Sequence, residues 1–284
     1  MPDLVIVLAL GSALAYGASD FVGGLLARRA SAWAVAVVGQ SSSAVCTLML
    51  ALLVDGAATG VDLRWGALAG LGGGLGTGLL YRGFATGRMS VVAPVSGVGA
   101  ALVPVLAGAV GGERPTLLVW LGILTALPGI WLVSRTPADP RDTGSRASVA
   151  LGVRDGVVAG LAFGLLFACL GQVPASAGFA PLAVAQLVSV PTVLLAAVIV
   201  RAPWVPREPA ARRALLVGPL GCTATGMFLV ATHHGMLSVA GVLSSLYPAG
   251  TVLLAALVLR ERVDRGQGLG LMLCAVAVTC VAAG

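Results

Sequence analysis

The chain has 284 residues, of which 58% are hydrophobic and only 10% are charged, with a formal net charge of +6. A soluble domain carries about 25% charged residues, and charge this sparse cannot cover the surface of a water-soluble protein of this size. All 17 basic residues are Arg, since Lys is absent, which excludes a Walker A lysine and a Schiff-base lysine.

The Arg residues lie in short connections between apolar stretches, not on one face or in a basic tail. That distribution is typical of membrane topology, so we expect a lipid bilayer, and not nucleic acid, as the partner of the basic residues. The five Cys lie singly in apolar runs, and His233-His234 have no Cys or carboxylate at ligand spacing. We therefore expect no metal and no cofactor.

Ten stretches are long and apolar enough to cross the hydrocarbon, which takes about 20 residues of helix. The predicted spans are approximately 4–27, 33–54, 64–84, 89–110, 116–134, 154–173, 180–200, 213–232, 236–259 and 267–283. The first is not a cleaved signal peptide, because its leader carries no positive side chain and its apolar run is too long. The sequence predicts an all-α, multi-pass protein of the plasma membrane with ten transmembrane helices.

The one long polar connection, residues 135–153, is rich in turn-forming residues and is predicted to be a flexible linker. It separates two five-span halves, 1–134 and 154–284. A shift of 148 residues places Gly87–Arg114 over Gly235–Arg262 without a gap, with ten of 28 positions identical. Because five is an odd number, the second half must enter the membrane in the opposite orientation. Inverted repeats of this kind are a common transporter architecture, with the substrate site near the midplane between the halves.

This arrangement resembles the EamA family of the drug/metabolite transporter superfamily, over essentially the whole chain. The resemblance rests on the two five-span halves and on short motifs: Tyr16–Phe21, Tyr247-Pro248, and a Ser-rich fourth span in each half that ends in Glu113-Arg114 or Glu261-Arg262. One departure is that Ala100 occupies the position matching Pro248. The family transports amino acids, other small metabolites and drugs. The resemblance implies a secondary transporter that exports a small organic metabolite or amino acid-like solute by alternating access.

Asp20 is the only acidic residue deep inside a predicted span. An intramembrane carboxylate is costly and is a functional hypothesis by default: it could bind a cationic group or carry a proton. The alternative is a structural ion pair with Arg82, near the end of the third span. Arg82 could instead extend to the interface or bind a substrate carboxylate.

Uncharged polar residues inside the spans either join neighbouring helices or line a cavity. We expect the repeat-matched pairs Gln40/Gln186 and Ser96/Ser244 to line the substrate cavity, and Tyr16 and Tyr247 to stack on a substrate. With Asp20 and Arg82 these residues form the predicted substrate site. Gly70, Gly74 and Gly78 form a small-residue stripe that is expected to allow close helix packing.

Several features stay open at this stage. The Arg-rich loops place both termini outside, whereas family members are usually drawn with both termini inside. A proton is the candidate coupling ion, but uniport or exchange is equally allowed, as is a homodimer. An intramembrane enzyme or a non-transporting membrane subunit is the alternative function, although no HExxH, GxSxG or paired intramembrane carboxylates occur.

Overall fold

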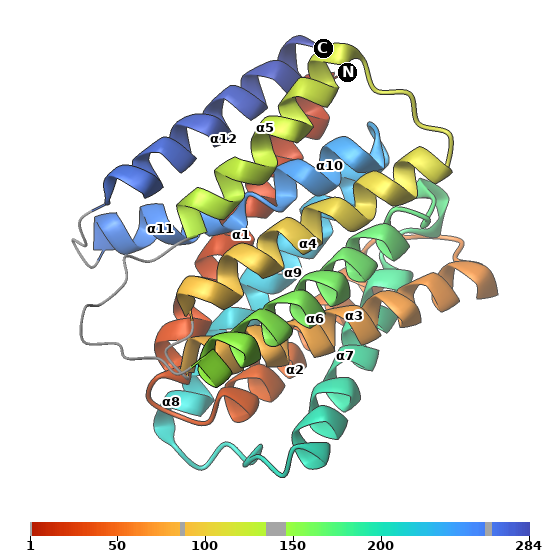
Figure 1. Ribbon diagram of the computed structural model, residues 1–284. Coiled ribbons are helices and arrows are strands. Elements are labelled where there is room, and N and C mark those ends of the chain that lie inside the picture. The colour runs from red at the N-terminus through yellow and green to blue at the C-terminus, as the bar shows by residue number, and fades with distance from the viewer. Residues whose placement is uncertain (1, 86–88, 135–145, 259–262) are drawn as a thin grey trace.

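The computed structural model describes residues 2–85, 89–134, 146–258 and 263–284, and within these ranges the chain is helical and has no strand (Figure 1). The long helices are α1 (Pro2–Ala27), α2 (Ala32–Leu53), α3 (Gly60–Ala85), α4 (Met89–Val110), α5 (Leu117–Ser134), α6 (Arg146–Leu170), α7 (Ala180–Ile199), α9 (Val217–Thr232), α10 (Leu237–Ser244), α11 (Tyr247–Val258) and α12 (Arg265–Ala283). Three short turns of helix complete the set: η1 (Ala175–Ala177), α8 (Pro209–Arg212) and η2 (Arg213–Leu216).

Eight helical segments in the described parts of the chain are long and apolar enough to cross a membrane. The segment Leu237–Val258, which joins α10 and α11, counts among them. Two helices fall outside this group: α3, which is rich in glycine, and α4, whose apolar part Val95–Val110 is shorter. The chain is therefore a multi-pass membrane protein, while the count of ten crossings remains a prediction.

The predicted ninth span is not one continuous helix. It divides at Ser245 and Leu246, so that α10 ends at Ser244 and α11 begins at Tyr247. Pro248 explains the break, because its ring lacks an N–H and would clash with the carbonyl four residues earlier in a continuous helix. The matching position in α4 is Ala100, and α4 is unbroken there.

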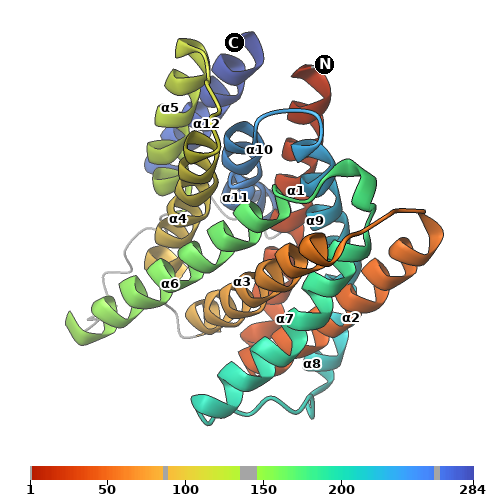
Figure 2. The same cartoon turned by 90° about the vertical axis from the view of Figure 1, so that its right-hand side faces the viewer.

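The contacts that join the two halves follow the internal repeat. In the first half α1 packs on α9, α10 and α11, and in the second half α6 packs on α3 and α4. Likewise α2 packs on α9, as α7 packs on α3. The pairs that occupy the same place in each half, α2 with α7 and α5 with α12, pack on each other, and α5 and α12 lie side by side in both views (Figures 1 and 2).

Two of these matched pairs run antiparallel. The Thr116 hydroxyl, just before α5, donates to the carbonyl of Gly284 at the end of α12 at 3.5 Å. The Ala57 amide, just after α2, donates at 2.8 Å to the carbonyl of Ser176, just before α7. The two chain termini lie at the same end of the molecule (Figures 1 and 2).

Glycine permits the closest helix contacts. A Cβ atom at Gly70 or Gly74 of α3 would overlap the carbonyl oxygen of Ala185 or Ser189 on α7. These two members of the predicted stripe therefore face α7, whereas Gly78 faces the ring of Trp33 on α2. Small residues at such positions let helix backbones approach closely in a membrane.

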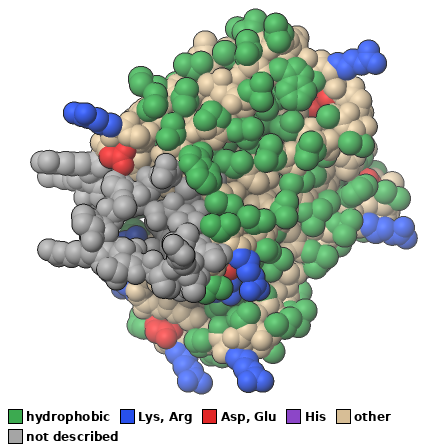
Figure 3. Space-filling model, viewed as in Figure 1, with side chains coloured by type: hydrophobic (Ala, Val, Ile, Leu, Met, Phe, Trp, Pro, Cys, Tyr) green, Lys and Arg blue, Asp and Glu red, His purple; other side chains and the backbone are tan. Residues whose placement is uncertain are grey.

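Large apolar side chains cover much of the outer surface shown in Figure 3. Leu52, Leu53, Val110 and Leu257 are each at least 74% exposed. In water such a surface would promote aggregation, whereas in a membrane it faces the lipid hydrocarbon.

Glu113, just after α4, connects the two halves. Its carboxylate accepts hydrogen bonds from the backbone N–H groups of Leu237 and Ser238, the second at 3.0 Å, at the start of α10. Free N–H groups and the helix dipole favour a negative charge at a helix N-terminus. Its repeat counterpart Glu261 lies outside the described residues.

We predict that Glu113→Gln lowers the free energy of unfolding by about 1–2 kcal/mol, because a charged cap is replaced by a weaker one. Thermal unfolding of the purified protein in detergent measures the change. Glu208→Gln is the matched control, because Glu208 is exposed and its side chain makes no cap hydrogen bond. Equal melting temperatures for wild type and Glu113→Gln would contradict the proposed role.

Candidate functional site

A cavity lies between the two halves. Its wall is formed by α1, α2 and α3 of the first half and by α6, α7, α9 and α11 of the second. The cavity has a volume of about 60 Å³, taken as the space open to the centre of a water molecule. Since one water needs roughly 10–15 Å³ by this measure, the cavity in this conformation has room for a few water molecules.

The cavity wall follows the internal repeat. Residues that line it fall into pairs that are 146–148 positions apart in the sequence and come from matching helices. These pairs are Tyr16/Phe163, Ser19/Leu166, Asp20/Phe167, Gly39/Ala185, Gln40/Gln186, Ser43/Ser189, Gly73/Gly221 and Thr77/Thr225. The cavity therefore lies where matching positions of the two halves meet.

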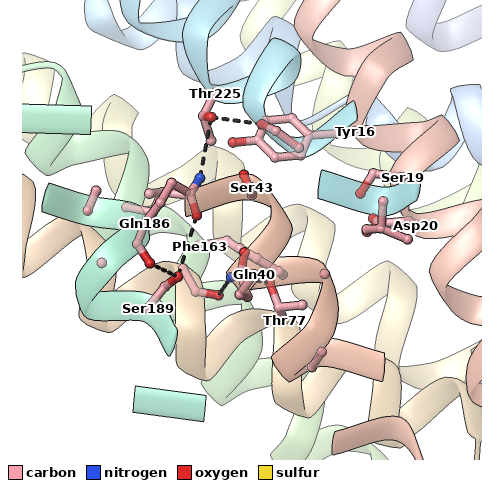
Figure 4. Close-up of a pocket in the computed structure, with 18 of the residues that line it drawn as sticks. Tyr16, Ser19, Asp20, Gln40, Ser43, Thr77, Phe163, Gln186, Ser189 and Thr225 are labelled. Atoms are coloured by element: carbon pink, nitrogen blue, oxygen red, sulfur yellow. Dashed lines mark hydrogen bonds between the residues drawn. The ribbon is translucent and has the colours of Figure 1, made fainter. Parts of the chain in front are cut away.

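Each half contributes a Gln–Thr hydrogen bond to the wall (Figure 4). Gln40 Nε2 on α2 donates to Thr77 Oγ1 on α3, at 3.3 Å. Gln186 Nε2 on α7 donates to Thr225 Oγ1 on α9, at 3.5 Å. Because both partners in each bond are repeat-matched, the same polar cluster occurs twice around the cavity.

Two hydroxyl groups on the wall have no hydrogen-bond partner among the described residues: Tyr16 Oη and Ser43 Oγ. Ser43 is only 2% exposed, so bulk water does not readily compensate it. Buried polar groups nearly always have a partner. Unpartnered hydroxyls on a cavity wall indicate that the cavity holds water or a polar solute.

Asp20 lies on the cavity wall beside Ser19, apart from the cluster that contains Gln186 and Ser189 (Figure 4). The Tyr81 hydroxyl donates to the Ser19 carbonyl at 3.5 Å and so fixes α3 against this part of α1. Asp20 supplies the only carboxyl group of the cavity wall in the part of the chain that the structure describes, and no Arg or His of that part lines it.

The eight predicted site residues divide into two groups. Five line the cavity: Tyr16, Asp20, Gln40, Gln186 and Tyr247. Ser96 lies behind the wall, where its hydroxyl is 3.4 Å from that of Tyr247, and the Ser244 hydroxyl donates to the Ala9 carbonyl at 3.4 Å. These two serines join helices, and Ser96 supports a cavity residue.

Arg82 also lies outside the cavity wall, and its ion pair differs from the predicted one. Arg82 Nε donates to Asp155 Oδ2 of α6 at 3.2 Å, and Nη2 forms a second contact with Oδ1. The predicted sixth span begins at residue 154, next to Asp155, but α6 begins earlier, at Arg146, and carries Asp155 well inside the helix. Arg82 thus joins α3 to α6, and Asp20 is not its carboxylate partner.

Sequence reasoning missed Thr77 and Thr225. Both are followed by glycine and lie 148 positions apart, the same shift that relates Gly87–Arg114 to Gly235–Arg262. Extending that comparison toward the N-terminus would have found them. Ser43 and Ser189 follow Gln40 and Gln186 at the same spacing and could have been paired in the same way.

No three His, Cys, Asp or Glu side chains come together as a metal site among the described residues. His233 Nε2 lies 3.0 Å from the carbonyl of Val173. Burial lowers the pKa of His233, and this hydrogen bond opposes that shift. The position supports a structural role at the end of α9.

We predict that Asp155→Asn lowers the free energy of unfolding by about 2 kcal/mol, because a partly buried guanidinium loses its carboxylate. Thermal unfolding of Arg82→Gln, Asp155→Asn and the double variant completes a double-mutant cycle. The free energy of unfolding of the double variant should fall by less than the sum of the two decreases in the single variants. Strict additivity would show that the pair is not energetically coupled.

Comparisons with known proteins agree with this architecture. A solved crystal structure of a protein that is 16% identical superposes with a TM-score of 0.66, covering 95% of this chain and 97% of the other. That likeness concerns the fold alone. No curated protein matches the chain. Residues 3–135 and 150–283 each match the EamA-like transporter family. The chain therefore belongs to the EamA-like transporter family and contains two copies of its repeat.

Proposed function

We propose that this protein is a secondary transporter that exports a small organic solute across the plasma membrane by alternating access. The observation that carries the proposal is the cavity between the halves, whose polar wall is built from repeat-matched residues. A solute bound there contacts both halves at once. Rocking one half against the other would then expose it to either side of the membrane.

The antiparallel packing of α5 on α12 and of α2 on α7 supports two halves with inverted topology. In an inverted pair, contacts that close one side of the membrane have counterparts that close the other. The carboxylate of Glu113 on the start of α10 is one such contact between the halves.

An ion gradient is the energy source in this proposal, and we assign the proton to Asp20. Its carboxylate lies on the cavity wall, and the other titratable side chains on that wall are the phenols of Tyr16, Tyr81 and Tyr247. Carboxylates facing a cavity inside a membrane are typical proton carriers in transporters. The phenols do not ionise readily near neutral pH, which leaves Asp20 as the carrier.

We predict that Thr77→Val and Thr225→Val each slow solute flux by about 10-fold, because each removes one of the matched Gln–Thr bonds and misplaces a cavity amide. Flux of a pooled metabolite set into proteoliposomes of the purified protein is the measurement. Thr279→Val is the matched control, since its exposed hydroxyl bonds only within α12. Unchanged flux in both cavity variants would remove these clusters from the site.

The same vesicles separate the competing functions. Solute flux supports a transporter, chemical conversion of a solute supports an intramembrane enzyme, and neither supports a non-transporting subunit. Comparing the two vesicle orientations tests whether export is the direction.

For proton coupling, we predict that solute addition changes the internal pH of wild-type vesicles and that Asp20→Asn abolishes this change. A trapped pH-sensitive dye reports it. Asp264→Asn is the control, because Asp264 caps α12 away from the cavity. Solute flux without any pH change in wild type would indicate uniport or solute exchange.

A further inference from the structure

The repeat-matched wall is symmetric in its glutamines, serines and threonines but not along α1 and α6. On α1 the wall carries Tyr16, Ser19 and Asp20. At the matching positions of α6 it carries Phe163, Leu166 and Phe167. Each hydroxyl or carboxyl group that α1 contributes to the wall thus has an apolar side chain as its repeat counterpart on α6.

The two phenylalanine rings of α6 on the wall pack against neighbouring aromatic rings. The ring of Phe167 stacks on that of Phe228, with centroids 4.4 Å apart, and meets Tyr16 edge-on at 5.8 Å. Phe163 packs edge-on against Tyr247 at 6.4 Å. Such rings present a rigid apolar surface, and an aromatic face also attracts a cation.

The charge on the wall has one sign. Asp20 is acidic, and in the described residues no Arg or His lines the cavity. Arg82, the residue expected to bind a substrate carboxylate, is engaged by Asp155. A solute carboxylate would therefore enter a site that holds another carboxyl group and no compensating cation, which is costly in a medium of low dielectric.

We propose that the cavity selects a small organic cation, with an ammonium group at Asp20 and an apolar, preferably aromatic, body against Phe163 and Phe167. The inference rests on the proposed transport function and names its substrate class. The hydroxyls of Tyr16 and Ser43, which lack partners in the described structure, are the further polar contacts for the solute. Anions and zwitterions are disfavoured because no Arg or His of the described cavity wall is available to pair with their carboxylate.

Binding to the purified full-length protein, measured by isothermal titration calorimetry, tests the charge preference. The probes are benzylamine, benzyl alcohol, benzoate and phenylalanine, which share a ring and differ in charge. Benzylamine should bind at least about 10-fold more tightly than the others, the size of a charge-assisted contact. Benzoate or phenylalanine binding as tightly as benzylamine, or no binding of benzylamine, phenethylamine or isoamylamine, overturns the proposal.

Variants test separately the roles of Asp20 on α1 and of Phe167 on α6. Asp20→Asn should weaken benzylamine binding by about 10- to 100-fold and leave benzyl alcohol unchanged, while Asp264→Asn should change neither. Phe167→Leu should weaken benzylamine more than the aliphatic isoamylamine. If Asp20→Asn fails to elute as a folded protein, the wild-type charge series decides alone. Equal losses for benzylamine and benzyl alcohol in Asp20→Asn would contradict a charge contact.

This outcome is separable from that of the transport proposal. Flux of a neutral or anionic metabolite without cation binding refutes the cation preference and leaves the transporter intact. Cation binding without flux of any solute refutes the transport proposal and supports the proposed cation site.

Discussion

In the hydrocarbon of a membrane, a polar group has no water to bond with, so it must find a partner inside the protein. Many hydroxyl groups of the described helices meet that demand by donating to a carbonyl of their own helix. The Ser134 hydroxyl bonds to the carbonyl of Ile130, and that of Thr192 to the carbonyl of Val188, each within its own helix. Against this background, the cross-helix Gln–Thr bonds and the unpartnered hydroxyls of Tyr16 and Ser43 stand out. They gather around one cavity, which is why that cavity is the functional candidate.

Small and large side chains alternate around the cavity. Gly70 and Gly74 let α3 approach α7 closely, while the long side chains of Gln40 and Gln186 and the rings of α1 and α6 line the cavity. The internal repeat places the glutamines twice, and Gly70 has its counterpart in Gly218, which meets Ser42 of α2. The shared features are common to both halves, so in the proposed site the positions where the halves differ, along α1 and α6, are the candidates for solute selection.

How far the sequence predicts the site depends on the range of each interaction. Gln40 and Gln186 were identified as matched residues, and both lie on the wall, because a repeat relates residues without any knowledge of packing. The partner of Arg82 was not identified. Asp155 lies at the very start of the predicted sixth span, 154–173, whereas the helix extends back to Arg146 and carries Asp155 in its interior. Helix geometry, and not apolarity, carries Asp155 to Arg82.

By itself, the sequence determined the solvent, the helical class, the two related halves and their family resemblance, because hydropathy and repeats are properties of the chain read in order. It also singled out Asp20 as an unusual carboxylate. The tertiary structure alone decided which side chains share a cavity, that Arg82 pairs with Asp155, and that the ninth span divides at Ser245 and Leu246 beside Tyr247. These outcomes depend on how helices from two halves, more than a hundred residues apart, come into contact, and no local pattern encodes that contact.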